Sequence, residues 1–194
     1  IEAIKKNFDV PVSLDTYKSE VAKAGVQAGM DLFNDIWGLQ YDPKMAKIIA
    51  QSGLPCVLMH NRKEKMGDEI KATPELEAMF REDFGRILTI AEEAGIDREK
   101  IILDPGVGFA KSYEQNLWVI NHLPLFQEMG YPVLLGTSRK SVVGLTLDLP
   151  VNERVEGTLA TTAFAVECGC CMVRVHDVRE NVRCLLYTSD AADE

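Results

Sequence analysis

The 194-residue sequence contains no apolar run of the roughly 18 residues or more that a membrane-spanning helix requires. Its first residues, IEAIKKNFDVPV, lack the charged and then apolar layout of a secretory signal, and we interpret them as a helix end that leads into a strand, in mid-fold. Basic residues are scarce: 21 Lys and Arg against 30 Asp and Glu give a net charge of −9, which argues against nucleic-acid binding. Such a chain must gather its cations in one place to bind a phosphate.

Cysteine is also sparse and odd in number. Three of the five cysteines lie at 168, 170 and 171, which is not a spacing that zinc sites use. We therefore expect buried free thiols and a reducing, cytoplasmic location.

What the sequence does contain is an alternation of short apolar runs with amphipathic stretches. The runs resemble strands buried on both faces and lie at 10–15, 31–36, 55–60, 100–105, 132–137 and 171–176. The stretches between them carry helix-start signals at Asp42-Pro43, Thr73-Pro74, Ser112 with Gln115, and Asn152, whose helix runs through Glu167 to Gly169. Alternation without hairpin signals predicts a parallel α/β sheet, either open or closed into a barrel.

Two segments depart from this alternation. Residues 60–73 form a long polar loop and are a candidate lid. Residues 187–194, YTSDAADE, offer no apolar face to continue a closing helix, so we predict one domain over 1–183 followed by a non-native or disordered tail at 184–194.

Polar residues end the apolar runs, where parallel α/β folds place their ligand-binding groups. Asp15, Asn34 and Asp104 supply two carboxylates and an amide, which suit a flat heterocycle with N–H donors and carbonyl acceptors. Each also has a structural alternative: Asp15 as the cap of the next helix, and Asn34 and Asp104 as turn residues. Asp35, on the opposite side of the strand from its neighbour, is the better turn candidate. Phe109 either stacks on the ring or packs.

Two further segments gather cations. GTSRKS at 136–141 ends a strand and opens a helix, and its hydroxyls, cations and backbone N–H groups suit an anion, although the spacing is not that of a P-loop. Arg174 and His176 alternate along the last run, so we expect both side chains on one face, although this pair alone also fits a structural role. Together the two segments predict a cationic corner, and since barrel enzymes often bind phosphate near strands seven and eight, they favour a barrel.

The motifs SLDTYKSEV, FNDIWGL, LMH, IILDPGVGFAKSYEQNL, LLGTSRKS and VRVHDV, in this order and spacing, resemble the dihydropteroate synthase family from about residue 8 to 183. The resemblance implies a TIM (β/α)8 barrel, here partial, in which the six runs are strands three to eight. It also implies a transferase of folate biosynthesis that condenses 6-hydroxymethyl-7,8-dihydropterin pyrophosphate with 4-aminobenzoate, giving 7,8-dihydropteroate and pyrophosphate.

The resemblance assigns roles residue by residue. Pterin is bound by Asp15, Asn34, Met59, Asp104 and Lys140, aminobenzoate (or a sulfonamide) by Phe109 and Ser138, and phosphate by Arg174 and His176, with Lys140, Asp104 and Arg174 as catalytic residues. The implied route is dissociative: pyrophosphate leaves, a delocalised pterin cation forms, and the neutral aniline nitrogen attacks. Such a route needs both developing charges to be balanced.

Parts of the family pattern have no counterpart in this sequence. The family's Mg²⁺ ligand lies in its first strand and the loop that closes over aminobenzoate follows its second, so Mg²⁺ is implied without a metal ligand here. We expect the chain alone to aggregate and to be nearly inactive, because missing strands leave unpaired edges, and the longer parent to be an active homodimer through its last helices. Two alternatives stay open: a methyltransferase-type pterin-binding module that serves a corrinoid partner and needs no cationic corner, and a non-enzymatic fragment.

Overall fold

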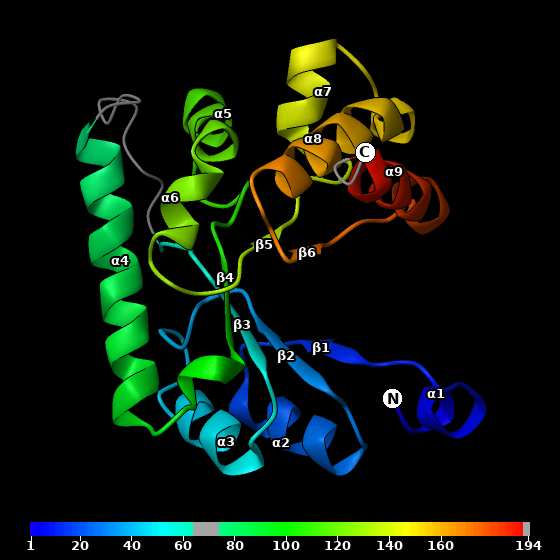
Figure 1. The fold of residues 1–194 in the computed structure, drawn as a ribbon. Coiled ribbons are helices and arrows are strands. Elements are labelled where there is room, and N and C mark those ends of the chain that lie inside the picture. Colours follow the sequence, from blue (N-terminus) through cyan, green and yellow to red (C-terminus); the bar gives the residue numbers. More distant parts are fainter. Residues whose placement is uncertain (64–73, 192–194) are drawn as a thin grey trace. The chain divides into compact units, whose positions relative to one another are not determined.

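The structure, a computed structural model, describes residues 1–63 and 74–191 (Figure 1). Every predicted apolar run contains a strand, and each strand is shorter than its run. The strands are β1 (Ser13–Asp15), β2 (Leu32–Asp35), β3 (Cys56–Met59), β4 (Ile101–Asp104), β5 (Leu134–Leu135) and β6 (Met172–Val173). The apolar runs thus locate the strands, whereas pairing with a neighbour, which a sequence does not display, sets where each one ends.

Helices follow the strands in chain order, as the alternation predicts. They are α1 (Glu2–Asn7), α2 (Ser19–Gln27), α3 (Met45–Ser52), α4 (Pro74–Glu93), α5 (Tyr113–Asn121), α6 (Leu123–Gln127), α7 (Ser141–Leu147), α8 (Val155–Glu167) and α9 (Val178–Ala191), with short 3-10 helices η1 (Arg98–Lys100) and η2 (Val151–Glu153). Within the described ranges, none of these helices has the length and apolar character needed to cross a membrane.

The chain divides into two compact units, which we describe one at a time. Unit 1 comprises Ile1–Asn61 and Glu77–Asp104, and unit 2 comprises Arg62–Leu76 and Pro105–Glu194. Unit 1 contains a four-stranded parallel sheet in the order β1-β2-β3-β4. The core around this sheet contains fully buried Phe33, Leu58 and Leu103. Helices α2 and α3 pack side by side (Figure 1).

Unit 2 is built around the parallel pair β5-β6 and the helices that follow each strand. Leu134 pairs with Met172 and Leu135 with Val173. Helices α8 and α9 pack against each other, and the buried Thr162 hydroxyl donates to the Asn181 side chain across them at 2.7 Å. Gly157 allows α7 and α8 to approach closely, because a Cβ at this position would overlap the Val143 side chain.

Three of the predicted helix boundaries are confirmed. Ser112 and Gln115 form a reciprocal capping box at the start of α5. Pro74 is the first residue of α4, although Thr73 lies outside the described residues. Helix α8 closes at Gly169, whose positive φ of 75° lets its N–H reach the carbonyl of Val166.

Two predicted helix starts are wrong. Helix α3 begins only after Lys44, because the Asp42 carboxylate accepts hydrogen bonds from the backbone N–H groups of Ser19 and Lys44 at 2.9 and 3.0 Å. Asn152 lies within η2, and α8 begins after Arg154 without a side-chain cap. In both places a polar residue that resembles a cap belongs to the preceding connection.

The two segments outside the alternation are described in part. Helix α9 runs unbroken through residue 191, so the segment 184–194 is helical as far as the structure describes it, with Leu186 and Tyr187 exposed. Whether this segment is native stays a prediction, as does the lid, since residues 64–73 lie outside the described part of the chain.

All five cysteines are free, as expected, but their predicted burial holds only for Cys56. Burial raises the pKa of this thiol to about 12. Cys168, Cys170 and Cys184 are half-buried and Cys171 is exposed, because the three clustered cysteines lie at the end of α8 and in the connection to β6 rather than inside the sheet.

Candidate active site

The register of the unit 1 sheet places four predicted pterin-binding residues on one face. Asp15 pairs with Asn34, Asn34 with Val57, and Val57 with Ile102. Residues paired across parallel strands project to the same side, and so do residues two apart along one strand. Met59 and Asp104, which pair with each other two residues beyond Val57 and Ile102, therefore project to the same face as Asp15 and Asn34.

Direct contacts tie these residues together. The Asn34 side-chain amide donates to the Asp15 carboxylate at 2.9 Å, with Asn34 buried and Asp15 exposed. Asp15 does not cap α2, whose N-cap is Lys18, so that alternative is wrong. Met59 and Asp104, paired at the ends of β3 and β4, are both buried. The strand ends of unit 1 thus present two carboxylates and an amide on one surface.

Asp35 is the residue that stabilises the turn after β2, as predicted. The Asn34 side chain is therefore not needed for this turn. The Asp35 carboxylate accepts from the backbone N–H groups of Trp37 and Leu39 at 2.9 and 2.8 Å. Burial raises the pKa of this carboxyl. The bonds hold Leu39 at a φ of 69°, a left-handed conformation that leucine rarely adopts.

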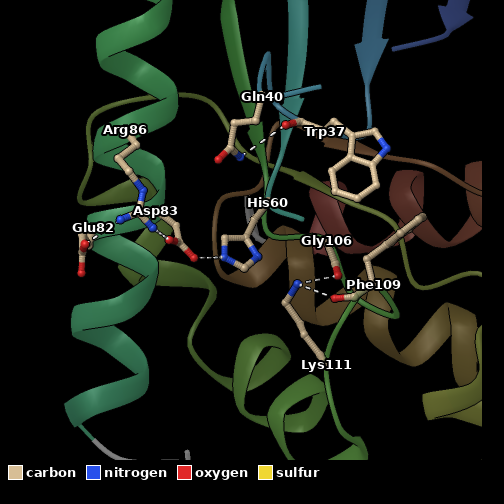
Figure 2. A network of polar contacts seen from close by, with 9 residues as sticks. All are labelled: Trp37, Gln40, His60, Glu82, Asp83, Arg86, Gly106, Phe109 and Lys111. Atoms are coloured by element: carbon tan, nitrogen blue, oxygen red, sulfur yellow. Dashed lines mark hydrogen bonds and ion pairs between the residues drawn. The ribbon is translucent and has the colours of Figure 1, made fainter. Parts of the chain in front are cut away.

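His60, which the sequence groups with the strand-end recognition residues, points instead to the helix side. Its Nε2 lies 2.8 Å from the Asp83 carboxylate on α4, and both side chains are buried (Figure 2). Arg86 pairs with the same carboxylate and with Glu82. The His60 ring packs on Phe80 at a centroid distance of 4.4 Å. The sequence gives no sign of this network, because α4 is far along the chain and its acidic residues look like a solvated face.

In unit 2, the loop after Asp104 is fastened from within. The Lys111 ammonium donates to the carbonyls of Gly106 and Phe109 at 2.9 and 3.0 Å (Figure 2). The Asn116 side chain accepts from the N–H of Gly108 at 2.6 Å. Lys111 belongs to the conspicuous DPGVGFAK motif, but its ammonium holds the conformation of this loop through backbone carbonyls.

This fastened loop brings Phe109 and Lys140 together. The Lys140 ammonium donates to the carbonyl of Val107 and lies 4.8 Å from the centroid of the half-buried Phe109 ring. A cation over an aromatic face is attracted by the ring quadrupole. Two residues predicted to meet the substrates are thus neighbours within unit 2.

The connections after β5 and β6 are cross-linked. Ser138 Oγ accepts from the backbone N–H of His176 at 3.1 Å and lies 3.0 Å from its Nδ1. Arg139 grips the Asp177 carboxylate with Nε, at 3.0 Å, and with Nη2. These hydrogen bonds hold the pKa of Asp177 below its ordinary value and raise that of Arg139. The guanidinium of Arg139 is therefore paired with a carboxylate, whereas the ammonium of Lys140 donates to the carbonyl of Val107.

The residues of the predicted cationic corner lie in unit 2, where strand β6 is shorter than the predicted run. Strand β6 ends at Val173, so Arg174 and His176 lie beyond it rather than alternating along it, and the same-face argument does not apply. Arg174 nevertheless continues the pairing through its backbone N–H to Leu135 at 2.9 Å. A Cβ at Gly136 would lie 3.9 Å from both Arg174 Cβ and Lys140 Nζ, so the Lys140 ammonium ends near the glycine beside which the Arg174 side chain begins.

Two surface grooves lie away from these residues. One of about 550 Å³ separates α2 from α3 and is lined in part by Lys23, Lys44 and Lys47. A second of about 220 Å³ lies among α5, α7 and α8. Neither is lined by a predicted site residue, so the chemistry of the strand ends, and not groove volume, identifies the candidate site.

The chain is a parallel α/β protein with polar residues at the ends of its strands. Comparison with known proteins identifies the class of enzyme to which it belongs. Residues 1–176 match the family described as pterin binding enzyme. Dihydropteroate synthases of Clostridium beijerinckii and Bacillus subtilis are 51% and 50% identical over 189 and 183 residues, which is 97% and 94% of this chain. The chain spans 68% and 62% of their lengths.

Solved structures agree. The chain is similar to a dihydropteroate synthase from Clostridium difficile crystallised in the presence of pteroic acid, with a TM-score of 0.91, 39% identity and coverage of 98% of this chain and 70% of that one. It is also similar to a Coxiella burnetii dihydropteroate synthase in complex with pteroic acid, with a TM-score of 0.92 and 31% identity. This match covers 98% of this chain and 71% of that one. The chain therefore belongs to the pterin-binding enzymes and, among them, to the dihydropteroate synthases, transferases of folate biosynthesis. The prediction of a partial (β/α)8 barrel is confirmed.

Proposed function

We propose that this chain carries the main substrate-binding set of a synthase that condenses 6-hydroxymethyl-7,8-dihydropterin pyrophosphate with 4-aminobenzoate. The observation that carries the proposal is the shared face of Asp15, Asn34, Met59 and Asp104 on the unit 1 sheet. Two relatives named for this activity are half identical to the chain. The methyltransferase-type alternative has no use for a cationic corner, to which Lys140, Arg174 and His176 of unit 2 would contribute.

The pterin ring, in this proposal, is held by charge-assisted hydrogen bonds. Asp104 leaves the buried end of β4 and suits the aminopyrimidine edge, since a carboxylate accepts two parallel N–H bonds. The Asn34 amide, held by Asp15, offers a second polar group on the same face. A carboxylate in these surroundings also balances positive charge that develops on the ring when the leaving group departs.

The leaving group and the second substrate are assigned to unit 2. Arg174 and His176 would hold the pyrophosphate, with His176 oriented by Ser138. Lys140 and Phe109, which lie against each other, would contact the pterin carbonyl and the aminobenzoate ring. Guanidinium, imidazole and ammonium groups stabilise the charge that collects on departing pyrophosphate, and the neutral aniline nitrogen then attacks the pterin methylene.

Mg²⁺ stays a proposal from the family resemblance. Among residues 1–63 and 74–191, no group of three or more His, Cys, Asp or Glu side chains could hold a metal ion. The described residues therefore do not fit a metal site by themselves, and we draw no step of the reaction through the metal.

A homodimer of the longer parent and a cytoplasmic location are further proposals. Exposed apolar residues recur at every fourth position along α9, at Val178, Val182 and Leu186, and Phe164 on α8 is exposed as well. Such a stripe suits a protein interface better than water. The free thiols suit a reducing compartment.

Product formation tests the activity. We expect little dihydropteroate from the 194-residue chain alone and clear turnover once the N-terminal segment of the Bacillus subtilis relative is joined to it. Turnover that stays absent in the extended protein would favour the non-enzymatic fragment, and normal turnover of the chain alone would contradict our expectation of inactivity. Titration with pyrophosphate separates the methyltransferase-type module, which should not bind it.

Asp104→Asn tests the pterin assignment. The substitution keeps the shape and removes the charge, so kcat/KM in the extended protein should fall about tenfold to hundredfold, the loss expected for a charge-assisted hydrogen bond. Glu82→Gln is the matched control, because Glu82 is an exposed carboxylate on α4. Equal loss in both variants would contradict the assignment.

A further inference from the structure

The residue between Ser138 and Lys140 has an unusual backbone. Arg139 has a φ of 57°, in the left-handed region that favours glycine. On one side of it, Ser138 bonds to His176, and on the other, Lys140 reaches Val107 and Phe109. A return of Arg139 to ordinary helical or extended backbone would rotate the chain by about 100° or more and redirect one of these side chains.

The guanidinium of Arg154 holds this turn by hydrogen bonds to its backbone carbonyls. Its Nη1 donates to the carbonyl of Arg139 at 3.0 Å and to that of Lys140 at 3.2 Å, while its Nε donates to the carbonyl of Leu149 at 3.0 Å. These carbonyls flank α7 at its two ends, so one planar fork spans the helix. A lysine could not reproduce this pattern, because its ammonium is a single point of donation.

Two further contacts make the arrangement specific to Arg154. Its own carbonyl begins α8 by accepting from the N–H and hydroxyl of Thr158. The guanidinium also occupies the space beside Gly144 in α7, where a Cβ would overlap it. Gly144 is thus the residue whose missing side chain makes room for the fork.

We propose that Arg154 is a positioning residue, which holds the left-handed turn at Arg139 so that Ser138 with His176, and Lys140, meet the phosphate and the second substrate. The inference rests on the proposed function and names a residue that touches no substrate. It predicts that the fork, rather than the positive charge of Arg154, sets the affinity for the anion.

The experiment measures pyrophosphate affinity by calorimetry with the chain joined to the N-terminal segment of the Bacillus subtilis relative, because we expect the chain alone to aggregate. Arg154→Ala and Arg154→Lys should each weaken binding about tenfold or more, a loss typical of a misplaced binding group. Millimolar guanidinium should restore Arg154→Ala, whereas sodium chloride at the same ionic strength should not. The thermal unfolding midpoint, recorded for every variant, identifies any loss of affinity that follows from unfolding at the assay temperature.

Gly144→Ala provides an independent perturbation, because its methyl group displaces the guanidinium while Arg154 itself stays in the sequence. It should weaken binding as Arg154→Ala does, add nothing to that substitution in the double variant, and prevent guanidinium rescue there. Gly85→Ala is the matched control, since a Cβ at this exposed position of α4 meets nothing within 4 Å.

The outcomes separate the two proposals. If the extended protein without these substitutions binds no pyrophosphate, the proposed phosphate-binding role of Arg174 and His176 is wrong, and the positioning role with it. If it binds pyrophosphate and the extended Arg154→Ala variant binds equally well, the positioning role alone is wrong. The same holds if folded Arg154→Ala loses affinity that guanidinium leaves unchanged.

Discussion

Replacement of His60 by Phe tests whether the buried network beneath the unit 1 strand ends stabilises the fold. The substitution keeps an aromatic ring against Phe80 and removes the hydrogen bond from Nε2 to Asp83, which spans 2.8 Å between side chains 1% and 6% exposed. The backbone N–H of residue 60, which donates to the carbonyl of Asp104 at 2.8 Å, is unaffected. The variant therefore removes the contact with Asp83 while an aromatic ring and the backbone hydrogen bond stay in place.

The magnitude follows from the partner that stays behind. A hydrogen bond to a charged group contributes about 1.5–3 kcal/mol, and a buried charge that loses its only partner costs about 3–5 kcal/mol. Asp83 keeps the guanidinium of Arg86, so the loss should lie in the lower range, near about 2 kcal/mol. His60→Ala also removes the ring from its aromatic neighbours and should cost about 3–5 kcal/mol.

Urea unfolding followed by Trp37 fluorescence is the assay. The chain has two tryptophans, one in each unit, so a Trp118→Phe background leaves Trp37 to report on unit 1. With a slope of about 2 kcal/mol per molar urea, the midpoint for His60→Phe should fall by about 1 M. Glu82→Gln, an exposed member of the same network, should change stability by less than about 0.5 kcal/mol. A midpoint for His60→Phe as high as that of the control would refute the reasoning.

Three further predictions concern other groups. Ser138→Ala should weaken pyrophosphate binding several-fold in calorimetry, because His176 loses the hydroxyl that orients it, and unchanged affinity would contradict this. Arg139 lowers the pKa of Asp177 from its ordinary 3.8, so their ion pair stabilises the fold above that pH, and this stabilisation is lost as the pH falls through the lowered pKa. The unfolding midpoint of Asp177→Asn should therefore lack the part of the acid dependence that comes from this pair. Iodoacetamide at pH 8, read by peptide mass mapping, should label exposed Cys171 well before Cys56, whose pKa is about 12.

The sequence predicts the strands of this protein well, because strands buried on both faces are continuous apolar runs. The register is less accessible, since it depends on pairing between segments far apart in the chain. Asn34 and Asp35 illustrate the difference. Alternation along one strand was enough to assign the turn to Asp35, which the structure confirms, but only the pairing of β1 with β2 shows that Asn34 bonds to Asp15.

The candidate site is predictable where residue type alone carries the chemistry, and less so where partners decide. Arg139 and Lys140 are adjacent cations of one motif and look equivalent in the sequence. In the structure, however, the Arg139 guanidinium is paired with Asp177, which lies 38 residues further along the chain. His60 directly follows strand β3 and Asp104 ends strand β4, yet the His60 side chain contacts α4. Pairing over such distances leaves no local pattern, so the sequence overestimates the number of charged groups available to substrates.

Left-handed backbone adds a physical reason for this overestimate. Outside glycine, positive φ values in the described residues occur at Leu39, Ala110, Arg139 and Asp148, and the first three lie in loops that directly follow strands β2, β4 and β5. Left-handed residues of this kind are strained by about 1–3 kcal/mol each, so something must hold them.

Charged side chains do so, three of them from the family motifs and one, Arg154, from outside them. Asp35 accepts from the N–H of Leu39, Lys111 donates to the carbonyl just before Ala110, and Asp177 and Arg154 hold Arg139. Loops that turn sharply after a strand need such hydrogen bonds and ion pairs, because the strained conformation would otherwise relax. Several charged residues of these motifs therefore hold loop geometry, which leaves fewer of them available to contact substrates. At Arg154, restoration of the alanine variant by guanidinium would distinguish such a positioning role from a general effect of charge.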